Sequence, residues 1–291
     1  MSYVDESAAV TASSLGVALT SPASTHTKPT GFTTLIASTS EETYWVTVSI
    51  WSNNMADSTV DESFLIDLAV GAVSSETVFI SNIPYFGNIE YGGISFSFPY
   101  TIASGSRVSA RCQSTASTET LRIMVRLSND DSYGTSTSNE TIGANTGASI
   151  GTDIDPGSSA NTKPTSYTTL TALSGIEYNC FLVFQALSDN DNINSAGAGL
   201  FDIATGAVSS EVDLIANEQY LASSLEVASN VTPYWATIPS GTRISARAQS
   251  TITDSNDRLI DLVIIGFAVT APSGGGGSGG GRLVNGGLIA A

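Results

Sequence analysis

The hexapeptide Gly71-Ala72-Val73-Ser74-Ser75-Glu76 occurs a second time, unchanged, as Gly206-Ala207-Val208-Ser209-Ser210-Glu211. Residues upstream of it recur as well, because Thr27-Lys28-Pro29-Thr30 returns as Thr162-Lys163-Pro164-Thr165. Both pairs are 135 residues apart. An offset shared by two distant places in the chain indicates that the two halves are copies of one unit.

Downstream residues extend the repeat. Residues 105–115 (GSRVSARCQST) return as residues 241–251 (GTRISARAQST), now 136 positions later. Two units of roughly 120 residues each have the size of domains with cores of their own. The predicted division is an N-terminal arm at 1–12, a first sandwich at 13–128, a Ser/Thr/Asn-rich linker at 129–146, a second sandwich at 147–270 and a Gly-rich tail at 271–291.

Composition places both units in the all-β class. Hydrophobic residues make up 41% of the 291 residues and charged residues 13%, which is typical of a folded protein. Ser, Thr, Gly and Asn are abundant and no helical periodicity is found, so strands and turns are expected. About seven or eight short strands per unit, with turn residues between them, favour two antiparallel β-sandwiches of the jelly-roll type.

Alternation of apolar residues along a strand predicts which side chains face the core. The inward set of the first copy is Tyr44, Val46, Val48 and Ile50. Allowing a one-residue slip, the matching set of the second copy is Tyr178, Cys180, Leu182 and Phe184. Cys112 shares a face with Val108 and Ala110, so both cysteines are expected to be small core residues.

The strand that follows the hexapeptide predicts a contact surface on the first copy. If Thr77 and Phe79 face the core, Val78 and Ile80 point outward. The second copy has Asp213 in the place of Val78. Extra outward apolar area on one copy suggests that a partner covers it.

Charge and hydropathy argue against two classes of partner. The formal net charge is −17, which disfavours binding to nucleic acid. No window of about 18 apolar residues is present, so no membrane-spanning segment is expected. The start, Met1 to Glu6, has neither a basic region nor an apolar one, which argues against a signal peptide.

Few residues indicate a catalytic, metal-binding or cofactor-binding site. His26 is the only histidine, and the second copy has Asn161 there, which argues against a catalytic triad. Residues 189–192 begin like a calcium loop, but Ile193 stands where an oxygen ligand is needed. No zinc spacing, phosphate-binding loop or dinucleotide fingerprint occurs. Paired carboxylates stay open as an alternative, because 27 acidic residues offer many pairs and no signal selects one. The prediction is a protein without catalytic residues, cofactor or metal, which is not an enzyme.

The ten basic residues are unevenly distributed. Seven lie on or at the start of the last two strands of a unit: Arg107, Arg111, Arg122, Arg126, Arg243, Arg247 and Arg258. Alternation places Arg107 and Arg111 on one face, and Arg243 and Arg247 on the matching face. Either these arginines pair within their unit, with Asp67, Glu76, Asp202 and Glu211, or part of the row faces another subunit or an acidic partner.

Two tryptophans suggest a separate surface. Trp45 and Trp51 share the outward face of one strand and could form an aromatic platform for a host-surface glycan. The alternative is that a neighbouring element covers them.

Three features resemble a group of tailed-bacteriophage virion proteins. The first is an apolar-Asp-apolar strand that leads into Gly-Ala-x-x-Ser-Glu, and the second is Gly-[Ser/Thr]-Arg-[Val/Ile]-x-Ala-Arg-x-Gln-Ser. The third is the Gly-rich end, which closes with residues 281–288, GRLVNGGL. The resemblance implies a non-enzymatic structural protein on the virion surface, either a capsid decoration (cement) protein or a tail or head fibre.

The resemblance also implies partners. Jelly-roll virion proteins of this kind commonly lie on threefold axes, so a homo-oligomer, first of all a trimer, is expected beside the major capsid protein or other virion proteins. The Gly-rich spacer at 274–281 is long enough to carry an apolar end to a neighbouring subunit. The apolar residues of that end are Leu283, Val284, Leu288 and Ile289.

Overall fold

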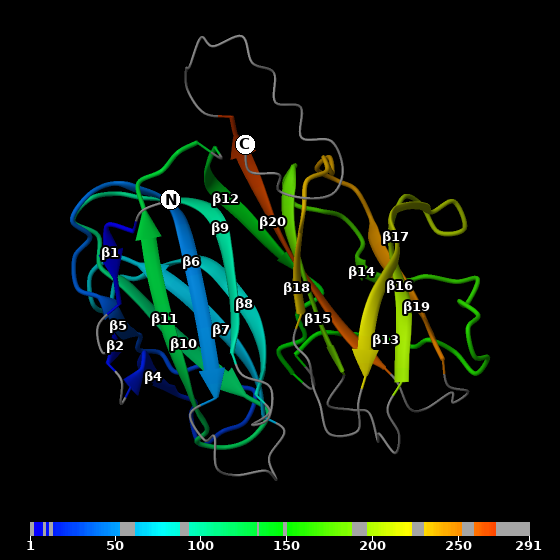
Figure 1. Cartoon of the computed structure of the whole chain (residues 1–291), viewed down its shortest axis with the longest axis horizontal. Coiled ribbons are helices and arrows are strands. Elements are labelled where there is room, and N and C mark those ends of the chain that lie inside the picture. Colours follow the sequence, from blue (N-terminus) through cyan, green and yellow to red (C-terminus); the bar gives the residue numbers. More distant parts are fainter. Residues whose placement is uncertain are drawn as a thin grey trace.

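The structure is a computed structural model of the whole chain (Figure 1). It describes residues 3–7, 10–11, 14–52, 62–87, 93–132, 134–147, 150–187, 197–222, 230–251 and 259–271. Strands and turns make up these residues, and no helix among them is long and apolar enough to cross a membrane. The all-β prediction is confirmed.

The first sandwich consists of a five-stranded and a four-stranded antiparallel sheet. Its front sheet contains β1 (Asp5–Glu6), β11 (Thr120–Ser128), β6 (Thr43–Ser52) and β9 (Ile94–Ile102) in that order, and β4 (Val17–Thr20) also pairs with β11. Its back sheet contains β5 (Thr33–Ile36), β10 (Val108–Ser114), β7 (Glu62–Val70) and β8 (Thr77–Gly87). A small hairpin of β2 (Val10–Thr11) and β3 (Ser14–Leu15) lies beside them.

The second sandwich repeats this order. Its front sheet contains β12 (Thr135–Ile142), β20 (Ile260–Thr270), β15 (Cys180–Leu187) and β18 (Asn230–Tyr234), and β13 (Thr152–Ile154) also pairs with β20. Its back sheet contains β14 (Thr168–Thr171), β19 (Ile244–Ser250), β16 (Gly197–Thr205) and β17 (Val212–Ala222). Because strand order and strand direction agree throughout, the prediction of two duplicated jelly-roll-like sandwiches is confirmed.

The segment predicted as a linker contains a strand. Within 129–146, Thr135–Ile142 forms β12, which pairs with β20 at the edge of the second front sheet. Its counterpart is β1, which lies in the segment predicted as an N-terminal arm and pairs with β11. This strand was not predicted because the sequence of β12 is almost entirely polar, although its threonines favour strand conformation.

The predicted one-residue slip does not exist. Thr43 pairs with Ile102 in the first sandwich, and Tyr178 pairs with Ile238 in the second, so the offset of 135 continues through this strand. Phe181 therefore matches Val46. The side chains of β15 that face the core of the second sandwich are Phe181 and Val183, together with Tyr178 just before the strand, rather than Cys180, Leu182 and Phe184.

The other face of the second front sheet is buried as well, against the first sandwich. It presents Cys180, Leu182, Phe184, Val263, Ile265 and Phe267, all of which belong to the core of the first sandwich. The ring of Phe184 meets Phe96 edge-on at 5.0 Å between centroids, and Phe267 stacks on Phe98 at 5.1 Å. One sheet thus serves two cores, and in Figure 1 its strands β12, β20, β15 and β18 lie between the two halves of the molecule.

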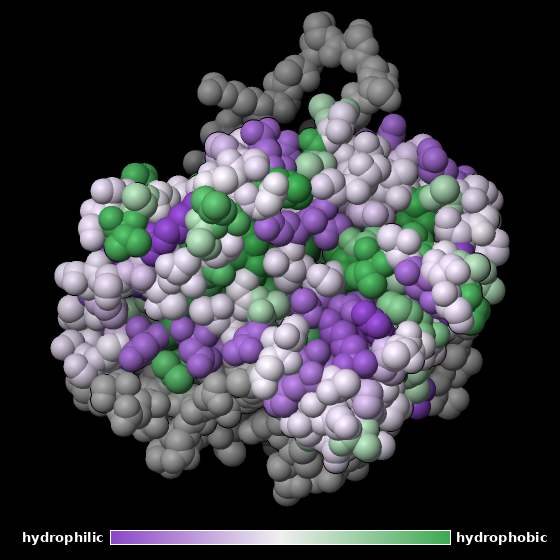
Figure 2. All heavy atoms as spheres, turned by 180° about the vertical axis from the view of Figure 1, so that it is seen from behind, coloured by the Kyte–Doolittle hydropathy of each residue, from purple (hydrophilic) through white to green (hydrophobic). Residues whose placement is uncertain are grey.

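Hydrogen bonds fix the edge of this shared sheet. Asn139 of β12 donates from its side-chain amide to the carbonyl oxygen of Phe79 in β8, and Thr141 Oγ1 donates to the Ser81 oxygen at 2.6 Å. On the face drawn in Figure 2, apolar side chains form separate groups among polar ones rather than one continuous surface. The apolar outer face of β15 and β20 is buried at the junction between the repeats.

The outward assignment of Ile80 is wrong. Register shifts in the pairing of β7 with β8 on both sides of Leu68 place Ile80 opposite Leu68, and both side chains are buried in the first core. A bulge adds one residue to a strand and so reverses the alternation beyond it. Val78 does point outward and is 36% exposed.

Both cysteines are free and buried. Cys112 faces the first core and Cys180 lies on the shared sheet. Burial raises the pKa of each thiol to about 12. Because the thiolate is the reactive form, we expect a thiol reagent at pH 8 to leave the native protein unlabelled and to label two cysteines per chain after unfolding in urea. Rapid labelling of the native protein would contradict the buried placement.

Candidate functional site

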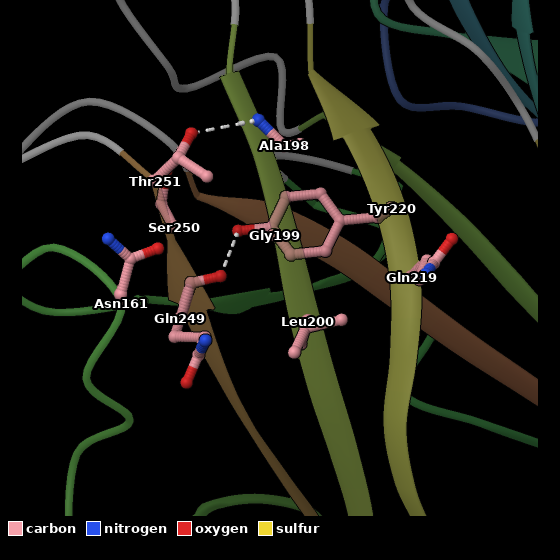
Figure 3. A pocket seen from close by; sticks show the side chains of 9 residues that line it. All are labelled: Asn161, Ala198, Gly199, Leu200, Gln219, Tyr220, Gln249, Ser250 and Thr251. Carbon is pink, nitrogen blue, oxygen red and sulfur yellow. Dashed lines mark hydrogen bonds between the residues drawn. The ribbon is translucent and has the colours of Figure 1, made fainter.

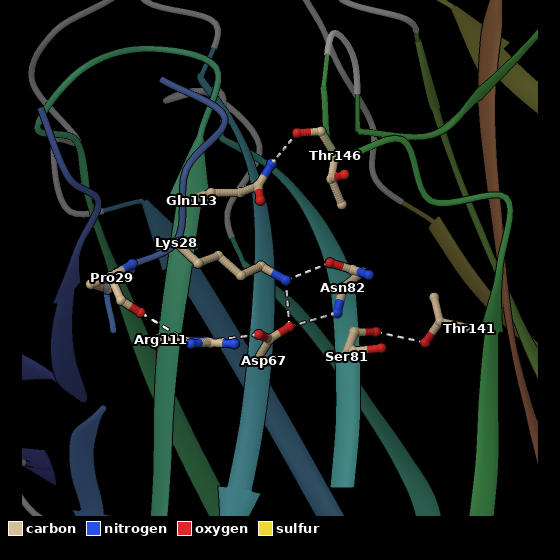
Figure 4. A network of polar contacts seen from close by, with 9 residues as sticks. All are labelled: Lys28, Pro29, Asp67, Ser81, Asn82, Arg111, Gln113, Thr141 and Thr146. Carbon is tan, nitrogen blue, oxygen red and sulfur yellow. Dashed lines mark hydrogen bonds and ion pairs between the residues drawn. The ribbon is translucent and has the colours of Figure 1, made fainter. Parts of the chain in front are cut away.

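Arg111, one of the predicted arginines, lies on the outer face of the first back sheet, within a network centred on Asp67 (Figure 4). Arg111 Nε donates to Asp67 Oδ2 at 2.9 Å, and the Lys28 ammonium pairs with Oδ1. The backbone N–H of Asn82 donates to the same Oδ1 at 3.0 Å. The carboxylate is buried, so three donors replace the water that it loses.

Local backbone geometry positions these donors. Asn82 adopts φ 57°, a left-handed conformation that asparagine tolerates, and its N–H thereby reaches the carboxylate. Arg111 extends over the ring of Phe32 at 4.5 Å and donates from Nη1 to the Pro29 oxygen at 3.1 Å. Lys28 and Phe32 belong to the loop that crosses the back sheet. The network therefore acts as a clamp that holds this loop on the sheet.

The second sandwich contains the same clamp. Arg247 Nε donates to Asp202 Oδ2 at 2.8 Å, Lys163 pairs with Oδ1, and the Asn217 N–H donates to Oδ1 at 2.9 Å. The guanidinium of Arg247 lies 4.4 Å from the centroid of the Tyr167 ring. Burial alone would raise the pKa of Asp202, but hydrogen bonds from Lys163, Asn217 and Arg247 outweigh it and hold this pKa below its usual value.

A second pair of contacts explains why the hexapeptide recurs. Arg107 Nη1 donates to Glu76 Oε1 at 2.8 Å and also reaches the Gly71 oxygen, so one arginine joins both ends of the turn. Arg243 does the same with Glu211 at 2.9 Å. Gly71 has φ 121°, and a Cβ there would lie 2.8 Å from the Ser75 oxygen, so glycine is required at this position.

These contacts favour pairing of the arginines within each unit. Arg126 likewise pairs with Glu6 at 3.0 Å, in an exposed position, and Arg122 donates to the Gly16 oxygen at 3.4 Å. Contact of any of these arginines with another subunit stays a prediction. Arg258 and the predicted tail residues Leu283, Val284, Leu288 and Ile289 lie outside the described residues, as do residues 189–193.

The only histidine marks a turn. His26 has φ 54° and its counterpart Asn161 has φ 57°, so both occupy the same left-handed position. Both also donate a backbone hydrogen bond to the last residue of a back-sheet strand, His26 to Ser114 and Asn161 to Ser250. Within the described ranges, no group of three or more His, Cys, Asp or Glu side chains could hold a metal ion.

The two tryptophans flank a row of hydroxyl groups on the outer face of the first front sheet. Between them on β6 lie Thr47 and Ser49, which bond to Ser97 at 2.7 Å and to Ser95 at 2.9 Å. Trp45 and Trp51 are half-buried, so each ring is partly covered and partly accessible. Sequence reasoning identified the tryptophans but missed the hydroxyl row.

A pocket of about 310 Å³ opens on the second back sheet (Figure 3). Its lining is Asn161, Ala198, Gly199, Leu200, Gln219, Tyr220, Gln249, Ser250 and Thr251. The Tyr220 hydroxyl donates to the Gln249 backbone oxygen at 3.1 Å, and its ring occupies the space that a side chain at Gly199 would need. The lining offers amide groups and apolar surface but no charged side chain.

At the matching place of the first sandwich, the side chains are larger or more deeply buried. Phe64 stands where the second copy has Gly199, and Leu65, which matches Leu200, is fully buried. Gln113 is buried there and donates from Nε2 to the Thr146 oxygen at 3.1 Å. Its counterpart Gln249 is only half-buried. The chain between β12 and β13 therefore covers in the first sandwich what is open in the second.

Comparison with known proteins identifies no family. No family model and no curated protein matches the sequence. Among solved structures, PNGase F of Flavobacterium meningosepticum aligns with 88% of this chain and 97% of its own, at 8% identity and a TM-score of 0.36. The CBM22-1-CBM22-2 tandem of Paenibacillus barcinonensis Xyn10C aligns with 79% of this chain and 80% of its own, at 11% identity and a TM-score of 0.21.

Two further solved structures align with this chain. PNGF-II aligns with 84% of this chain at 7% identity and a TM-score of 0.36, and this chain covers 60% of its length. The infectious bursal disease virus Gx strain structure aligns with 79% of this chain and 58% of its own, at 10% identity and a TM-score of 0.24. At these identities and TM-scores the likenesses are weak and assign no role to this chain.

The comparisons correct the prediction that the protein is not an enzyme. A peptide-N(4)-(N-acetyl-β-D-glucosaminyl) asparagine amidase aligns with 88% of this chain and 98% of its own, at 9% identity and a TM-score of 0.37. The prediction was drawn from missing motifs in an all-β chain, and such chains include enzymes, so it is not retained. At this similarity the alignment does not transfer an activity to this chain either.

Proposed function

We propose that the protein is a structural component of the surface of a tailed-bacteriophage particle, where it serves as a capsid decoration protein. The shared front sheet carries this proposal. This sheet joins the two repeats through a common core, with Phe267 and Phe184 packed against side chains of the first sandwich. Such a body suits a protein that holds neighbouring subunits at a fixed spacing.

The residues behind the phage resemblance support the same role. The Gly-Ala-x-x-Ser-Glu turn is held by Arg107 in one copy and Arg243 in the other, and the second arginine of each motif closes a buried clamp on Asp67 or Asp202. Each motif thus stabilises a surface turn or loop.

The partners of this proposal are other copies of the chain, in a trimer, and the major capsid protein. Several large apolar side chains are available for such contacts because they are exposed: Val73, Val78, Leu173, Val208, Val212 and Trp235. Small scattered apolar groups on a polar surface are typical of interfaces that form on assembly rather than of obligate dimers.

Electron microscopy of purified virions labelled with antibody against this protein tests the proposal. We expect label on the capsid surface. Label on the tail, or virions that lack the protein by mass spectrometry, would overturn the assignment as a decoration protein. Deleting residues 274–291 is expected to lower the amount per virion while both sandwiches stay folded, and full-length protein supplied from the same plasmid is the control.

A fibre that binds host-surface glycans is the second candidate. The half-buried rings of Trp45 and Trp51 favour it, because sugars stack on aromatic rings. The exposed Ser95 of β9 adds a hydroxyl group beside the buried Ser49. In this case Trp51→Ala should abolish binding on a glycan array, whereas Trp235→Ala, on the other sandwich, should leave it intact. Equal binding by both variants would exclude this surface.

A further inference from the structure

The first sandwich shows how the chain that leaves its front sheet covers its back sheet. After β11 ends at Ser128, the chain builds β12 along the edge of β8 and then passes onto the back sheet. There the Thr146 oxygen accepts a hydrogen bond from Gln113, and Ala144 packs against the first core. Leu65, which pairs with Gln113 on the neighbouring strand, is fully buried.

On the back sheet of the second sandwich, no described segment takes the place that residues 144–146 occupy on the first. Leu200 and Gln249, the counterparts of Leu65 and Gln113, are half-buried and line the pocket of about 310 Å³. Figure 3 shows Gln249 between Asn161 and Leu200 in the lining of this pocket. The chain that would cover this surface by the same route is the one that leaves β20, the residues after Thr270.

The C-terminal chain after β20 is long enough to reach this surface by the same route. Ser128 pairs with Trp45 and Phe267 pairs with Cys180, and these two pairs are equivalent, so both positions mark the same point of the fold. Thr146 lies 18 residues after Ser128, and Asn285 lies 18 residues after Phe267. By this count Leu283 takes the place of Ala144, and the Gly-rich residues 274–281 span the distance that β12 spans.

We propose that the C-terminal segment 282–289 binds back onto the second back sheet of its own chain and fills this pocket. Leu283 covers Leu200, and the backbone near Asn285 accepts the hydrogen bond of Gln249 as Thr146 accepts that of Gln113. Extended residues advance about 3.3 Å each, so the Gly-rich spacer reaches as far as the strand that it replaces. The segment is apolar apart from Arg282 and Asn285, which suits a pocket without charged groups.

Disulfide trapping tests this docking and does not depend on the proposed function. The test protein is the full chain with Gln249→Cys and Asn285→Cys, and the matched control carries Leu173→Cys, a 67% exposed position of the same sandwich, with Asn285→Cys. The native cysteines are buried and give little background. Under mild oxidation we expect the first pair to form an intramolecular disulfide at least about tenfold faster than the control.

Equal rates for the two pairs would overturn the proposal. Disulfide-linked dimers instead of a monomeric product would overturn it as well, since the segment would then occupy the pocket of another copy. Adding Leu283→Asp to the first pair places a charge against Leu200 and should reduce trapping to the control rate. If trapping of that triple variant stays fast, Leu283 does not fill the pocket.

Discussion

Replacing Phe267 with alanine is expected to lower the free energy of unfolding of the entire protein by about 3–5 kcal/mol. Phe267 is fully buried and stacks on Phe98 of the other sandwich at 5.1 Å. Removing its ring leaves a cavity in a cluster that contains residues of both repeats. Because one sheet serves two cores, damage to a strand of the second repeat should destabilise the first repeat as well.

The tryptophans allow this coupling to be measured. Trp45 and Trp51 lie on β6 of the first sandwich, and Trp235 lies in the second. In a Trp235→Phe background, fluorescence reports the first sandwich alone. We expect Phe267→Ala to move its urea midpoint strongly, and Val212→Ala, at a 69% exposed position, to leave it nearly unchanged. If Phe267→Ala leaves the urea midpoint of the first sandwich unchanged, the shared core is refuted.

The second large effect is expected at the buried clamp. Asp202→Ala leaves Lys163 and Arg247 without their carboxylate in a site where their side chains are only 12% and 24% exposed. Removing one partner of a buried ion pair costs about 3–5 kcal/mol. The exposed pair of Arg126 with Glu6 provides the comparison, and Arg126→Ala should cost less than about 1 kcal/mol. Similar losses in the two variants, measured by urea unfolding, would count against the clamp.

The pH dependence of this effect has a definite sign. The folded pKa of Asp202 lies below its unfolded value of about 3.9, so folding favours the ionised carboxylate. Its contribution is complete above that value and disappears as the pH falls through the folded pKa. The stability difference between the wild type and Asp202→Ala should therefore be constant near neutrality and shrink below about pH 4. A difference that grows on acidification would show that the carboxylate is not stabilised by its cationic neighbours.

The duplication made most of the fold predictable. Equal offsets of the hexapeptide and its neighbours defined two equal domains, and alternation on β6 identified Val46, Val48 and Ile50 as core residues. The same comparison identified the arginines and the acidic residues with which they pair. Residues that recur at a fixed offset perform the same local task, so one copy predicts the other.

Predictions failed where the two copies differ. On β6 the outward residues Thr47 and Ser49 are polar, whereas their counterparts on β15 are Leu182 and Phe184. Interpreting both strands as alternating required a slip, although residues 180–184 of β15 form a continuous apolar run of the kind expected for a strand buried on both faces. That run was the available signal for a shared sheet.

The pocket and the bulge had no comparable signal. The pocket depends on Gly199 in the place of Phe64 and on which segment covers Leu200, and neither is visible without the strand pairing. The burial of Ile80 depends on register shifts opposite Leu68, which alternation alone does not contain. Both features depend on how strands pair, which the order of residues along one strand does not show.

Native-state hydrogen exchange in increasing urea is the most direct test of the central claim that one sheet serves both cores. It should be resolved for peptides from β6 and β11, from the shared strands β15 and β20, and from β16 and β19. We predict that the slowest amides of all three groups converge on one free energy of opening, because the sandwiches unfold together. If β15, β20, β16 and β19 open together at lower urea while β6 and β11 keep their full protection, the repeats are independent and the claim is wrong.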